Sequence, residues 1–307
     1  MRILVVGAGG IGGYFGGRLL DAGRDVTFLV RPKRAELLAR NGLVIRSALG
    51  DVDRAHPPTV TADALHDPFD LVLLSCKSYD LESAVADLAP AVGANTAIIP
   101  LLNGMRHLDV LDARFGAAHV LGGLCFISTT VGPNGEILHL NRAHQLTFGE
   151  RDGTRSARVE RIVAAFEGAT FEARPSDAIV QAMWEKWVFI AAGAGITCLM
   201  RSAVGDVVAA GGADVSLALH DECAAIAAAA GFAPGAAARE RGHATFTTAG
   251  STLTASMLRD VERGAPTEAD HIIGDLLHRS GTPNGSGLLR LAYLHLLSYD
   301  ARRGREA

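Results

Sequence analysis

The sequence predicts an α/β N-terminal domain followed by an all-helical C-terminal domain. A glycine-rich turn follows the first strand-like segment, and strand-like and helix-like segments then alternate through the first half of the chain. From about Ser176 onward, Ala- and Leu-rich helical stretches dominate. The 307 residues suit two domains, and we expect these to cover residues 1–174 and 175–307.

The first residues have the pattern of a dinucleotide-binding turn. Residues 1–6 form a short apolar strand pattern, and the glycine-rich run leads from it into an apolar helix. Gly7 permits the tight turn, Gly9 lets the backbone approach a pyrophosphate, and Gly12 lets the helix pack on the strand. The helix N-terminus offers N–H groups to the phosphates. We therefore predict a Rossmann-type domain whose cofactor-binding residues include Gly7, Gly9, Gly10, Ile11 and Gly12.

The end of the second strand, expected over residues 25–30, favours NADPH over NADH. An NAD site would carry Asp or Glu there to bind the ribose 2′-hydroxyl, but this chain has Arg31, with Lys33 and Arg34 close behind. A guanidinium binds a 2′-phosphate at two points, whereas a carboxylate repels it. The alternative is a solvated basic loop, and the position after the second strand favours the cofactor interpretation.

The remaining patterns give an order of elements. We expect, in turn, an edge hairpin around 43–52, a buried strand over 71–76, a helix over 80–92, a strand over 97–100, a strand over 119–122, a tight turn at 133–135 with a strand from 136, and a strand over 146–149 that closes the sheet. In the helical half, breaks are expected near 211–212, 232–235, 264–266 and 282–285.

Composition excludes several classes of protein. The formal net charge of −4 and the lack of a basic stripe argue against nucleic acid as a partner. The longest apolar stretch, residues 187–200, is too short and too interrupted by glycine to span a membrane. The four cysteines are scattered and the histidines show no ligand pairing at helical spacing, so we predict no metal site and no disulfide framework. Reduced thiols in a cytoplasmic protein are the expectation.

Several motifs in a fixed order together resemble one family over nearly the whole chain. They are the glycine-rich turn with Arg31, Cys76-Lys77-Ser78-Tyr79, Leu102-Asn103-Gly104-Met105, Trp184-Glu185-Lys186-Trp187, Ser256-Met257-Leu258-Arg259-Asp260 and Thr267-Glu268-Ala269-Asp270. The chain resembles the ketopantoate reductases, or 2-dehydropantoate 2-reductases. The resemblance implies reduction of a 2-keto acid by NADPH, most specifically 2-dehydropantoate to pantoate in pantothenate biosynthesis. It leaves a homodimer open as the assembly.

Lys77 and Asn103 each follow the carboxyl end of a predicted strand, where an open α/β sheet binds its ligand. From position alone, Lys77 is equally well a solvated lysine, whereas Asn103 with Gly104 is more simply explained as a turn, because Asn-Gly is a standard turn dipeptide. The resemblance favours function for both. It implies that Lys77 binds the cofactor and that Asn103 lies beside both cofactor and substrate.

Lys186 is the residue that we predict to transfer the proton. It shares a helical face with Met183, Ile190, Ala194 and Thr197, on a helix expected to start at Ser176 as N-cap. A lysine on an apolar face either extends its ammonium to solvent or is functional. Desolvation there would lower its pKa towards the range of a general acid. The matching lysine of the family is the proposed general acid.

Ser256 and Glu268 are assigned to substrate binding by resemblance. The local sequence alone favours a simpler interpretation, the first turn of a helix. Thr267 would be its cap, and Glu268 and Asp270 would be the acidic residues of that turn. The family places a substrate-binding glutamate at this position, twelve residues after a serine that matches Ser256. A carboxylate can accept hydrogen bonds from a substrate hydroxyl, and a serine can donate to a substrate carboxylate.

The chain departs from the family one and two helical turns after Lys186. The family usually carries asparagines there, which line the substrate pocket, whereas this chain has Ile190 and Ala194. Loss of these polar groups disfavours a hydroxylated substrate and favours a more apolar one. Two alternatives therefore stay open: an NADP-linked dehydrogenase of another keto or hydroxy acid, and a non-catalytic NADPH-binding sensor. We expect His107, near Asn103, to be a loop residue and the next candidate for proton donor.

Overall fold

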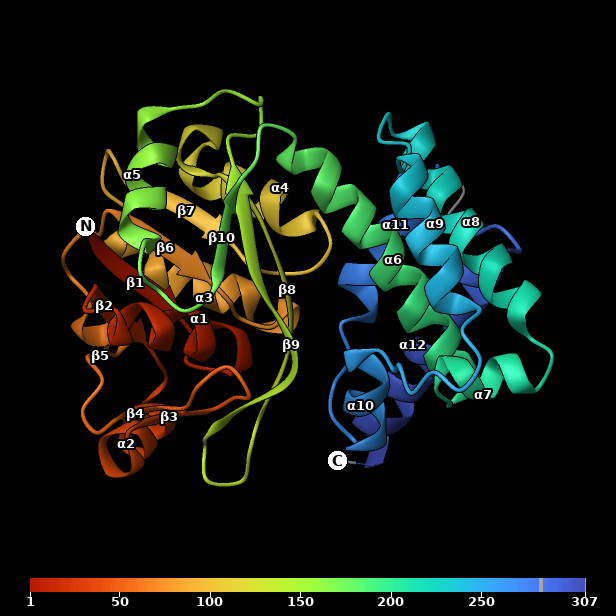
Figure 1. Cartoon of the computed structure of the whole chain (residues 1–307), viewed down its shortest axis with the longest axis horizontal. Coiled ribbons are helices and arrows are strands. Elements are labelled where there is room, and N and C mark those ends of the chain that lie inside the picture. The colour runs from red at the N-terminus through yellow and green to blue at the C-terminus, as the bar shows by residue number, and fades with distance from the viewer. Residues whose placement is uncertain (282–283, 307) are drawn as a thin grey trace. The chain divides into compact units, whose positions relative to one another are not determined.

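A computed structural model describes residues 1–281 and 284–306 of the chain. The chain divides into two compact units (Figure 1). The N-terminal unit comprises Met1–Leu102 with His107–Val180, and the C-terminal unit comprises Asn103–Arg106 with Gln181–Ala307. The expected boundary after residue 174 falls inside the last strand of the N-terminal unit, whereas the observed division lies slightly later, within the first helix of the helical part.

A five-stranded parallel sheet forms one half of the N-terminal unit. Its order is β5-β2-β1-β6-β7, and every adjacent pair is parallel. Its strands are β1 (Arg2–Val6), β2 (Asp25–Leu29), β5 (Thr59–Val60), β6 (Leu71–Leu74) and β7 (Ala97–Pro100). Strands β1, β6 and β7 are almost wholly buried, because their apolar runs lie in the core.

A second sheet carries the rest of this unit's strands. Its order is β10-β9-β3-β4, and β8 pairs with β9. The strands are β3 (Leu43–Arg46), β4 (Val52–Arg54), β8 (Gly122–Val131), β9 (Ile137–Gly149) and β10 (Glu172–Pro175). The predicted hairpin at 43–52 thus forms, but as β3 and β4 of this second sheet. The turn at 133–135 is confirmed, since Gly135 N–H donates to Gly132 O and β9 follows it.

Two strand predictions are wrong in detail. Residues 117–119 form a 3₁₀ turn, η4 (Ala117–His119). Of the strand predicted at 119–122, Val120 forms only an isolated parallel bridge with Ile98 of β7, and the next strand, β8, begins at Gly122. Residues 146–149 are the end of the long strand β9, which closes no edge of the parallel sheet. Both errors have one cause: pairing between distant segments, which local pattern does not report, fixes where these strands begin and end.

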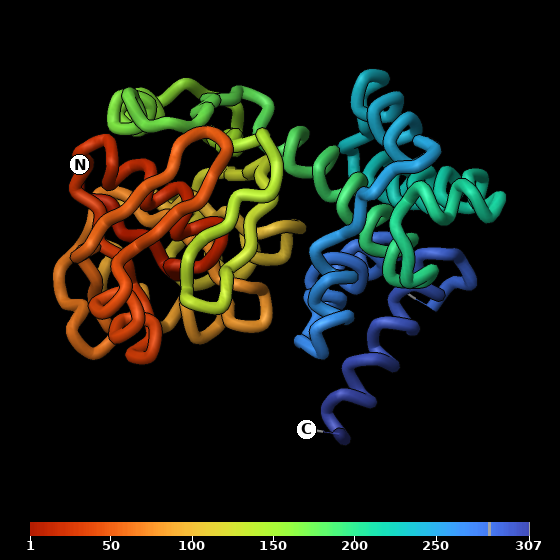
Figure 2. Tube along the Cα trace, turned by 60° about the horizontal axis from the view of Figure 1, so that its bottom comes forward, coloured from red at the N-terminus to blue at the C-terminus, as the bar shows by residue number. Residues whose placement is uncertain are grey.

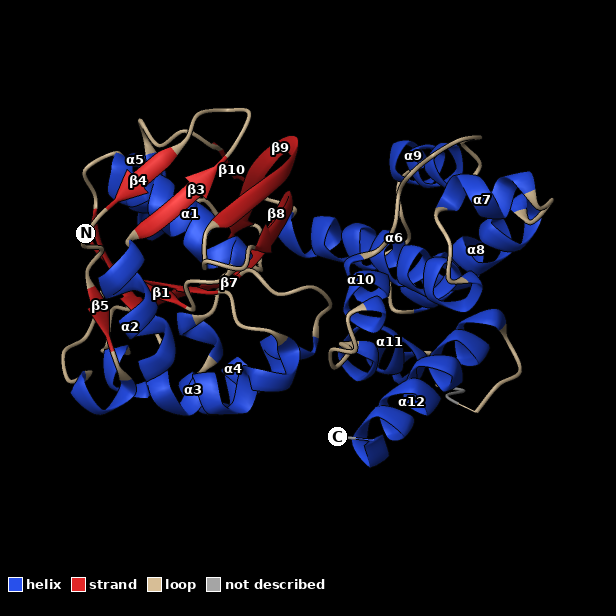
Figure 3. Cartoon of the chain, turned by 90° about the horizontal axis from the view of Figure 1, so that it is seen from below, coloured by secondary structure: helices blue, strands red, loops and turns tan. Residues whose placement is uncertain are grey.

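The helices of the N-terminal unit lie on both faces of the parallel sheet. They are α1 (Gly10–Asp21), α2 (Pro32–Asn41), α3 (Leu81–Leu88), α4 (Arg106–Phe115) and α5 (Ala157–Phe166). Figure 3 shows α1 between the two sheets, with α3 and α4 on the other side of the parallel sheet. Helix α3 is shorter than predicted. It is flanked by the 3₁₀ turns η2 (Ser78–Asp80) and η3 (Ala89–Ala91), and Pro90 ends it.

Glycines let α1 approach the parallel sheet closely. A Cβ added at Gly12 would lie 2.1 Å from Gly7 O, and one added at Gly16 would lie 2.6 Å from the ring of Phe28. Both distances are shorter than any real contact, so neither position accepts a side chain without a shift of the backbone or the core. One face of α1 is therefore fitted to β1 and β2.

The neighbouring face of α1 is fitted in the same way to the second sheet. A Cβ at Gly13 would lie 2.3 Å from Ile137 Cδ1, and one at Gly17 would lie 2.7 Å from Ile45 Cδ1. Gly13 and Gly17 are four residues apart, as Gly12 and Gly16 are, so each pair lies on one helical face. The two sheets are therefore packed on a helix that presents glycines at its closest contacts with each of them.

Among its described residues, the C-terminal unit has helices as its only regular elements. They are α6 (Ile179–Met200), α7 (Val204–Ala209), α8 (Ala213–Ala229), α9 (Ala236–Phe246), α10 (Ser256–Glu262), the π-helical turn η5 (Asp270–Gly274), α11 (Asp275–Arg279) and α12 (Leu288–Glu306). Figure 2 traces them from α6 in green to α12 in dark blue. No helix of the described ranges is long and apolar enough to cross a membrane.

The predicted helix breaks agree with the observed elements where they can be compared. Breaks at 211–212, 232–235 and 264–266 fall between α7 and α8, between α8 and α9, and after α10. The break at 282–285 includes residues 282 and 283, which lie outside the described residues. Ser176 is not the N-cap of α6. Its N–H donates to Phe148 O and its hydroxyl accepts from Ala178 N–H, so the helix begins only at Ile179.

Candidate active site

The glycine-rich turn has the geometry of an anion cradle. Gly7 adopts φ +91°, and its N–H donates to Leu29 O at 3.0 Å. Ser75, directly after β6, donates its hydroxyl to Val6 O at 2.8 Å and so fastens the turn to the sheet. A Cβ added at Gly9 would meet no atom within 4 Å, so this backbone faces open space. Open backbone at a helix N-terminus fits a pyrophosphate.

The other residues predicted to bind the cofactor, Gly10, Ile11 and Gly12, are closely packed against other parts of the unit. A Cβ at Gly10 would lie 2.7 Å from Thr129 Oγ1 of β8, and Gly12 is closed off by the carbonyl of Gly7. Ile11 packs against the core of the unit. Gly9 is therefore the residue of this run with free space around it, whereas Gly10 and Gly12 serve the packing of α1. Cofactor binding by Gly7, Gly9, Gly10, Ile11 and Gly12 stays a prediction.

Arg31 lies at the end of β2, as the sequence predicted, and makes an ion pair. Its Nη2 donates to Asp80 Oδ1 at 2.5 Å, and 66% of its side chain is exposed. The hydrogen bond and the charge of Asp80 raise the pKa of Arg31 above its usual value. An exposed pair of this kind contributes about 0–1 kcal/mol, so a stronger anion can displace Asp80.

Arg34 has a role that the sequence did not reveal. Its Nε and Nη2 donate to Ala8 O at 3.1 and 2.8 Å, so its guanidinium lies directly against the glycine-rich turn. Burial lowers the pKa of Arg34. The sequence placed it in a basic triplet with Arg31 and Lys33, and no local signal indicated that it binds a backbone carbonyl. Lys77 lies partly buried at the start of η2, just past the carboxyl end of β6.

In the C-terminal unit, α6 carries Lys186 and is fixed at the adjacent residue. Trp187 is fully buried, and its Nε1 donates to Ile272 O of η5 at 2.8 Å. The guanidinium of Arg279 lies 5.7 Å from the Trp187 ring. Because η5 begins two residues after Glu268, this bond ties the turn of α6 that bears Lys186 to the segment that bears Glu268.

The Asn103-Gly104 turn packs on the same π-helical segment. Gly104 adopts φ +82°, and a Cβ there would lie 3.0 Å from His271 O and 3.2 Å from the His271 ring. Glycine is thus required both for the backbone conformation and for the close approach. Burial lowers the pKa of His271, although the charge of Glu268 and a hydrogen bond with the Asn103 backbone oppose this. Asn103 and Glu268 therefore both neighbour His271, which sequence reasoning missed.

Ser256 lies at the start of α10 and is linked to the far end of α6. The N–H of the preceding Ala255 donates to Thr197 Oγ1 at 3.4 Å, and Thr197 donates to Gly193 O. Thr197 is three residues after Ala194, so Ser256 is attached near the Ala194 end of the predicted Lys186 face. Ala194 is 1% exposed, and Ile190 is half-buried.

The hydroxyl of Thr267 caps the segment that follows it, as the sequence predicted. The structure adds a second hydrogen bond of this hydroxyl and a π-helical turn after it. Thr267 Oγ1 accepts from Ala269 N–H at 3.3 Å and donates to Asp300 Oδ2 of α12 at 2.5 Å. Glu268 stays partly exposed beside this buried threonine. The helix that follows opens with the π-helical turn η5, which local pattern did not predict. Such turns are rare and frequent at functional sites.

His107 is not a loop residue. It lies in the first turn of α4, belongs to the N-terminal unit, and is fully buried. The sequence prediction failed because the loop after Asn103 ends earlier than expected, at Arg106. Since a fully buried ring offers no access to a substrate, His107 loses its place as a candidate proton donor.

Comparisons with known proteins agree with this arrangement over the whole chain. A family model described as ketopantoate reductase PanE/ApbA matches residues 3–153, and its C-terminal counterpart matches residues 178–286. The chain is 39% identical over 305 residues to "Uncharacterized oxidoreductase YkpB" of Bacillus subtilis, covering 99% of this chain and 100% of the relative. It is 28% identical to a 2-dehydropantoate 2-reductase of Mesorhizobium japonicum, covering 89% of each.

Solved structures of similar proteins share the fold of this chain. The crystal structure of 2-dehydropantoate 2-reductase from Methylococcus capsulatus superposes with a TM-score of 0.85 at 30% identity, covering 99% of this chain and 98% of that one. Both the parallel-sheet domain and the helical domain are therefore shared with proteins of known fold.

Proposed function

The chain belongs to the ketopantoate reductase family, and we propose that it reduces a 2-keto acid to a 2-hydroxy acid with NADPH. The first candidate substrate is 2-dehydropantoate, and the proposed proton donor is Lys186. The observation that carries this proposal is the buried hydrogen bond from Trp187 Nε1 to Ile272 O. It joins the helical turn that bears Lys186 to the segment that bears Glu268, so that two groups of opposite charge are available to one substrate.

The proposed chemistry divides among few side chains. The bound reduced cofactor supplies the hydride. Hydride addition to a ketone leaves negative charge on oxygen, and the Lys186 ammonium stabilises this charge and delivers the proton. Glu268 accepts a hydrogen bond from a substrate hydroxyl, and Ser256 donates one to the substrate carboxylate. Asn103, at the turn fixed by Gly104, orients the cofactor and the substrate.

The proposed preference for NADPH depends on the relative strengths of two interactions of Arg31. A charge-assisted hydrogen bond contributes about 1.5–3 kcal/mol, whereas the exposed pair between Arg31 and Asp80 contributes about 0–1 kcal/mol. A 2′-phosphate therefore exchanges favourably with Asp80 as the partner of Arg31. Lys77 is proposed to bind the phosphates or ribose from the end of β6. The free thiols fit a reducing compartment, and we propose that the enzyme works in the cytoplasm.

The activity itself is tested with the pure protein. We expect the nicotinamide absorbance to fall when the protein, NADPH and a panel of 2-keto acids that includes 2-dehydropantoate are mixed. Turnover of at least one keto acid supports the proposed reductase. Tight NADPH binding with no turnover of any keto acid would instead identify the chain as a sensor and would sink the proposal.

The cofactor prediction concerns Arg31. We expect wild type to bind NADPH more tightly than NADH, and Arg31→Ala to weaken NADPH binding about 10- to 150-fold with little effect on NADH. Asp80→Asn is the matched control: it frees Arg31, so the preference for NADPH should persist or rise by up to about fivefold. Fluorescence titration of both cofactors measures these affinities. Equal affinities of wild type for NADH and NADPH would show that Arg31 does not read the 2′-phosphate.

The catalytic prediction concerns Lys186. Lys186→Ala should lower kcat by about 10²–10⁴ while the Kd for NADPH stays nearly unchanged, because a positioned general acid acts on the chemical step. Lys186→Arg keeps the positive charge without a readily released proton, so it should recover substrate affinity more than kcat. Steady-state kinetics at saturating substrate measure both variants. If Lys186→Ala keeps full turnover, the proton comes from another group.

A second candidate function has a specific observation in its favour. Ile190 and Ala194 follow Lys186 by one and two helical turns, and neither side chain can hydrogen-bond to a substrate hydroxyl. A hydroxyl left unpaired in an apolar surrounding costs about 1–3 kcal/mol. The proposed alternative substrate is therefore a 2-keto acid with fewer hydroxyl groups than 2-dehydropantoate.

The double variant Ile190→Asn/Ala194→Asn separates the two candidates. It should raise kcat/KM for 2-dehydropantoate, relative to a less hydroxylated competitor, by about 1–3 kcal/mol in transition-state terms. The ratio is informative even if mispacking at the buried Ala194 lowers both activities. An unchanged ratio would mean that these side chains do not face the substrate. Strong selectivity of wild type for 2-dehydropantoate would mean that other residues recognise its hydroxyl.

A further inference from the structure

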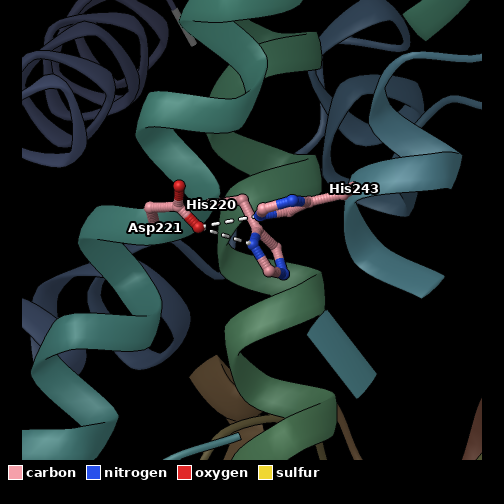
Figure 4. A group of neighbouring side chains, drawn as sticks. All are labelled: His220, Asp221 and His243. Carbon is pink, nitrogen blue, oxygen red and sulfur yellow. Dashed lines mark hydrogen bonds and ion pairs between the residues drawn. The ribbon is translucent and has the colours of Figure 1, made fainter. Parts of the chain in front are cut away.

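Three potential metal ligands meet on the C-terminal unit, apart from every residue assigned to the reductase reaction. His220 and Asp221 come from α8, and His243 comes from α9 (Figure 4). Asp221 Oδ1 lies 2.8 Å from His243 Nε2 and 3.6 Å from His220 Nδ1. The three ligand atoms all lie within 4.8 Å of one another. Two imidazoles and one carboxylate thus point to a common centre.

The position of His220 points independently to a missing ligand. Its side chain is 2% exposed, and its Nδ1 has no hydrogen-bond partner among the described residues. Asp221 Oδ1, at 3.6 Å, is beyond hydrogen-bond distance. A buried polar atom without a partner costs about 1–3 kcal/mol, and such atoms are rare in folded proteins. A ligand between the three groups removes this cost.

The surrounding helices hold the His220 ring in place. A Cβ added at Gly242 would lie 2.3 Å from His220 Nε2, so only glycine leaves room for the ring against α9. Phe246, four residues after Gly242 on α9, also packs against the His220 ring, and the centroids of the two rings are 5.7 Å apart. With one edge of the ring held against α9, Nδ1 faces the centre that Asp221 and His243 share.

We propose that His220, Asp221 and His243 bind a divalent transition-metal ion of the zinc type. Imidazole nitrogen and carboxylate oxygen are ordinary zinc ligands, and three protein ligands with a water molecule complete a tetrahedral shell. Bonds of about 2.0–2.1 Å place ligand atoms about 3.4 Å apart, so the widest pair must close by at most about 1.4 Å. His243 is 38% exposed and can turn to make this adjustment.

The ion would join α8 to α9, because His220 and Asp221 lie on α8 and His243 lies on α9. Phe246 also stacks on Phe189 of α6, with ring centroids 5.2 Å apart, so the site belongs to the packing of the helical unit.

Zinc binding to the whole chain tests the proposal. Untagged protein, treated with a chelator and then freed of it, is titrated with Zn²⁺ by calorimetry, and the melting temperature is measured with and without Zn²⁺. We expect one saturable site and a raised melting temperature, because a ligand that binds only the folded state stabilises it. His243→Asn and Asp221→Asn should each weaken binding at least about tenfold, since even indirect supports of metal ligands contribute about 10- to 100-fold.

Two further measurements make the test specific. His66→Asn changes an exposed histidine of the other unit and should leave zinc affinity unchanged. Co²⁺ in place of Zn²⁺ should give the visible absorption of a tetrahedral site in wild type and lose it in His243→Asn. Both targeted ligands are exposed enough to be replaced without loss of the core, and the melting temperature of each variant without Zn²⁺ shows whether it is folded. Absence of a saturable site, or equal affinity in wild type, His243→Asn and Asp221→Asn, would overturn the proposal, and the three side chains would then form only a hydrogen-bonded cluster.

Discussion

The close packing of α1 between two sheets is the constraint on which the N-terminal unit depends. Gly12 and Gly16 face the parallel sheet, and Gly13 and Gly17 face the second sheet. This packing fixes the start of α1, and therefore the backbone at Gly9, relative to β1. A dinucleotide-binding turn needs such rigidity, because its N–H groups bind phosphate through position alone. The glycines of α1 thus serve packing on two sides.

Helix α6 has the corresponding place in the C-terminal unit. In its first half, Trp187 Nε1 donates a hydrogen bond to Ile272 O of η5. Near its end, Thr197 Oγ1 accepts a hydrogen bond from the N–H of Ala255, which precedes Ser256. Residues 187 and 197 are separated by about 15 Å along a helix that rises 1.5 Å per residue. The segments that bear the two proposed substrate-binding residues are therefore attached at two separate points on the helix that bears Lys186. Rigid elements of this kind position side chains better than loops do.

Local signals in the sequence predicted the elements, and distant contacts decided the rest. The turn at Gly7 and the strand that follows Gly135 are determined by neighbouring residues, so they could be predicted from the sequence. The second sheet could not, because its strand β9 pairs with β3 and β10 across long separations. For the same reason no pattern indicated that Arg34 binds Ala8 O or that His271 packs on Gly104. The family resemblance supplied roles for site residues that spacing alone left open.

The central claim is that the bond from Trp187 Nε1 to Ile272 O positions Lys186 for proton transfer. The direct measurement is the steady-state kinetics of Trp187→Phe, which removes the donor and keeps an aromatic side chain. Trp184→Phe on the same helix is the control, since Trp184 stacks on Phe232 at a centroid distance of 5.3 Å. The account predicts that Trp187→Phe lowers kcat at least about tenfold with unchanged NADPH affinity, whereas Trp184→Phe has a much smaller effect. Equal kcat values for wild type and Trp187→Phe would contradict it.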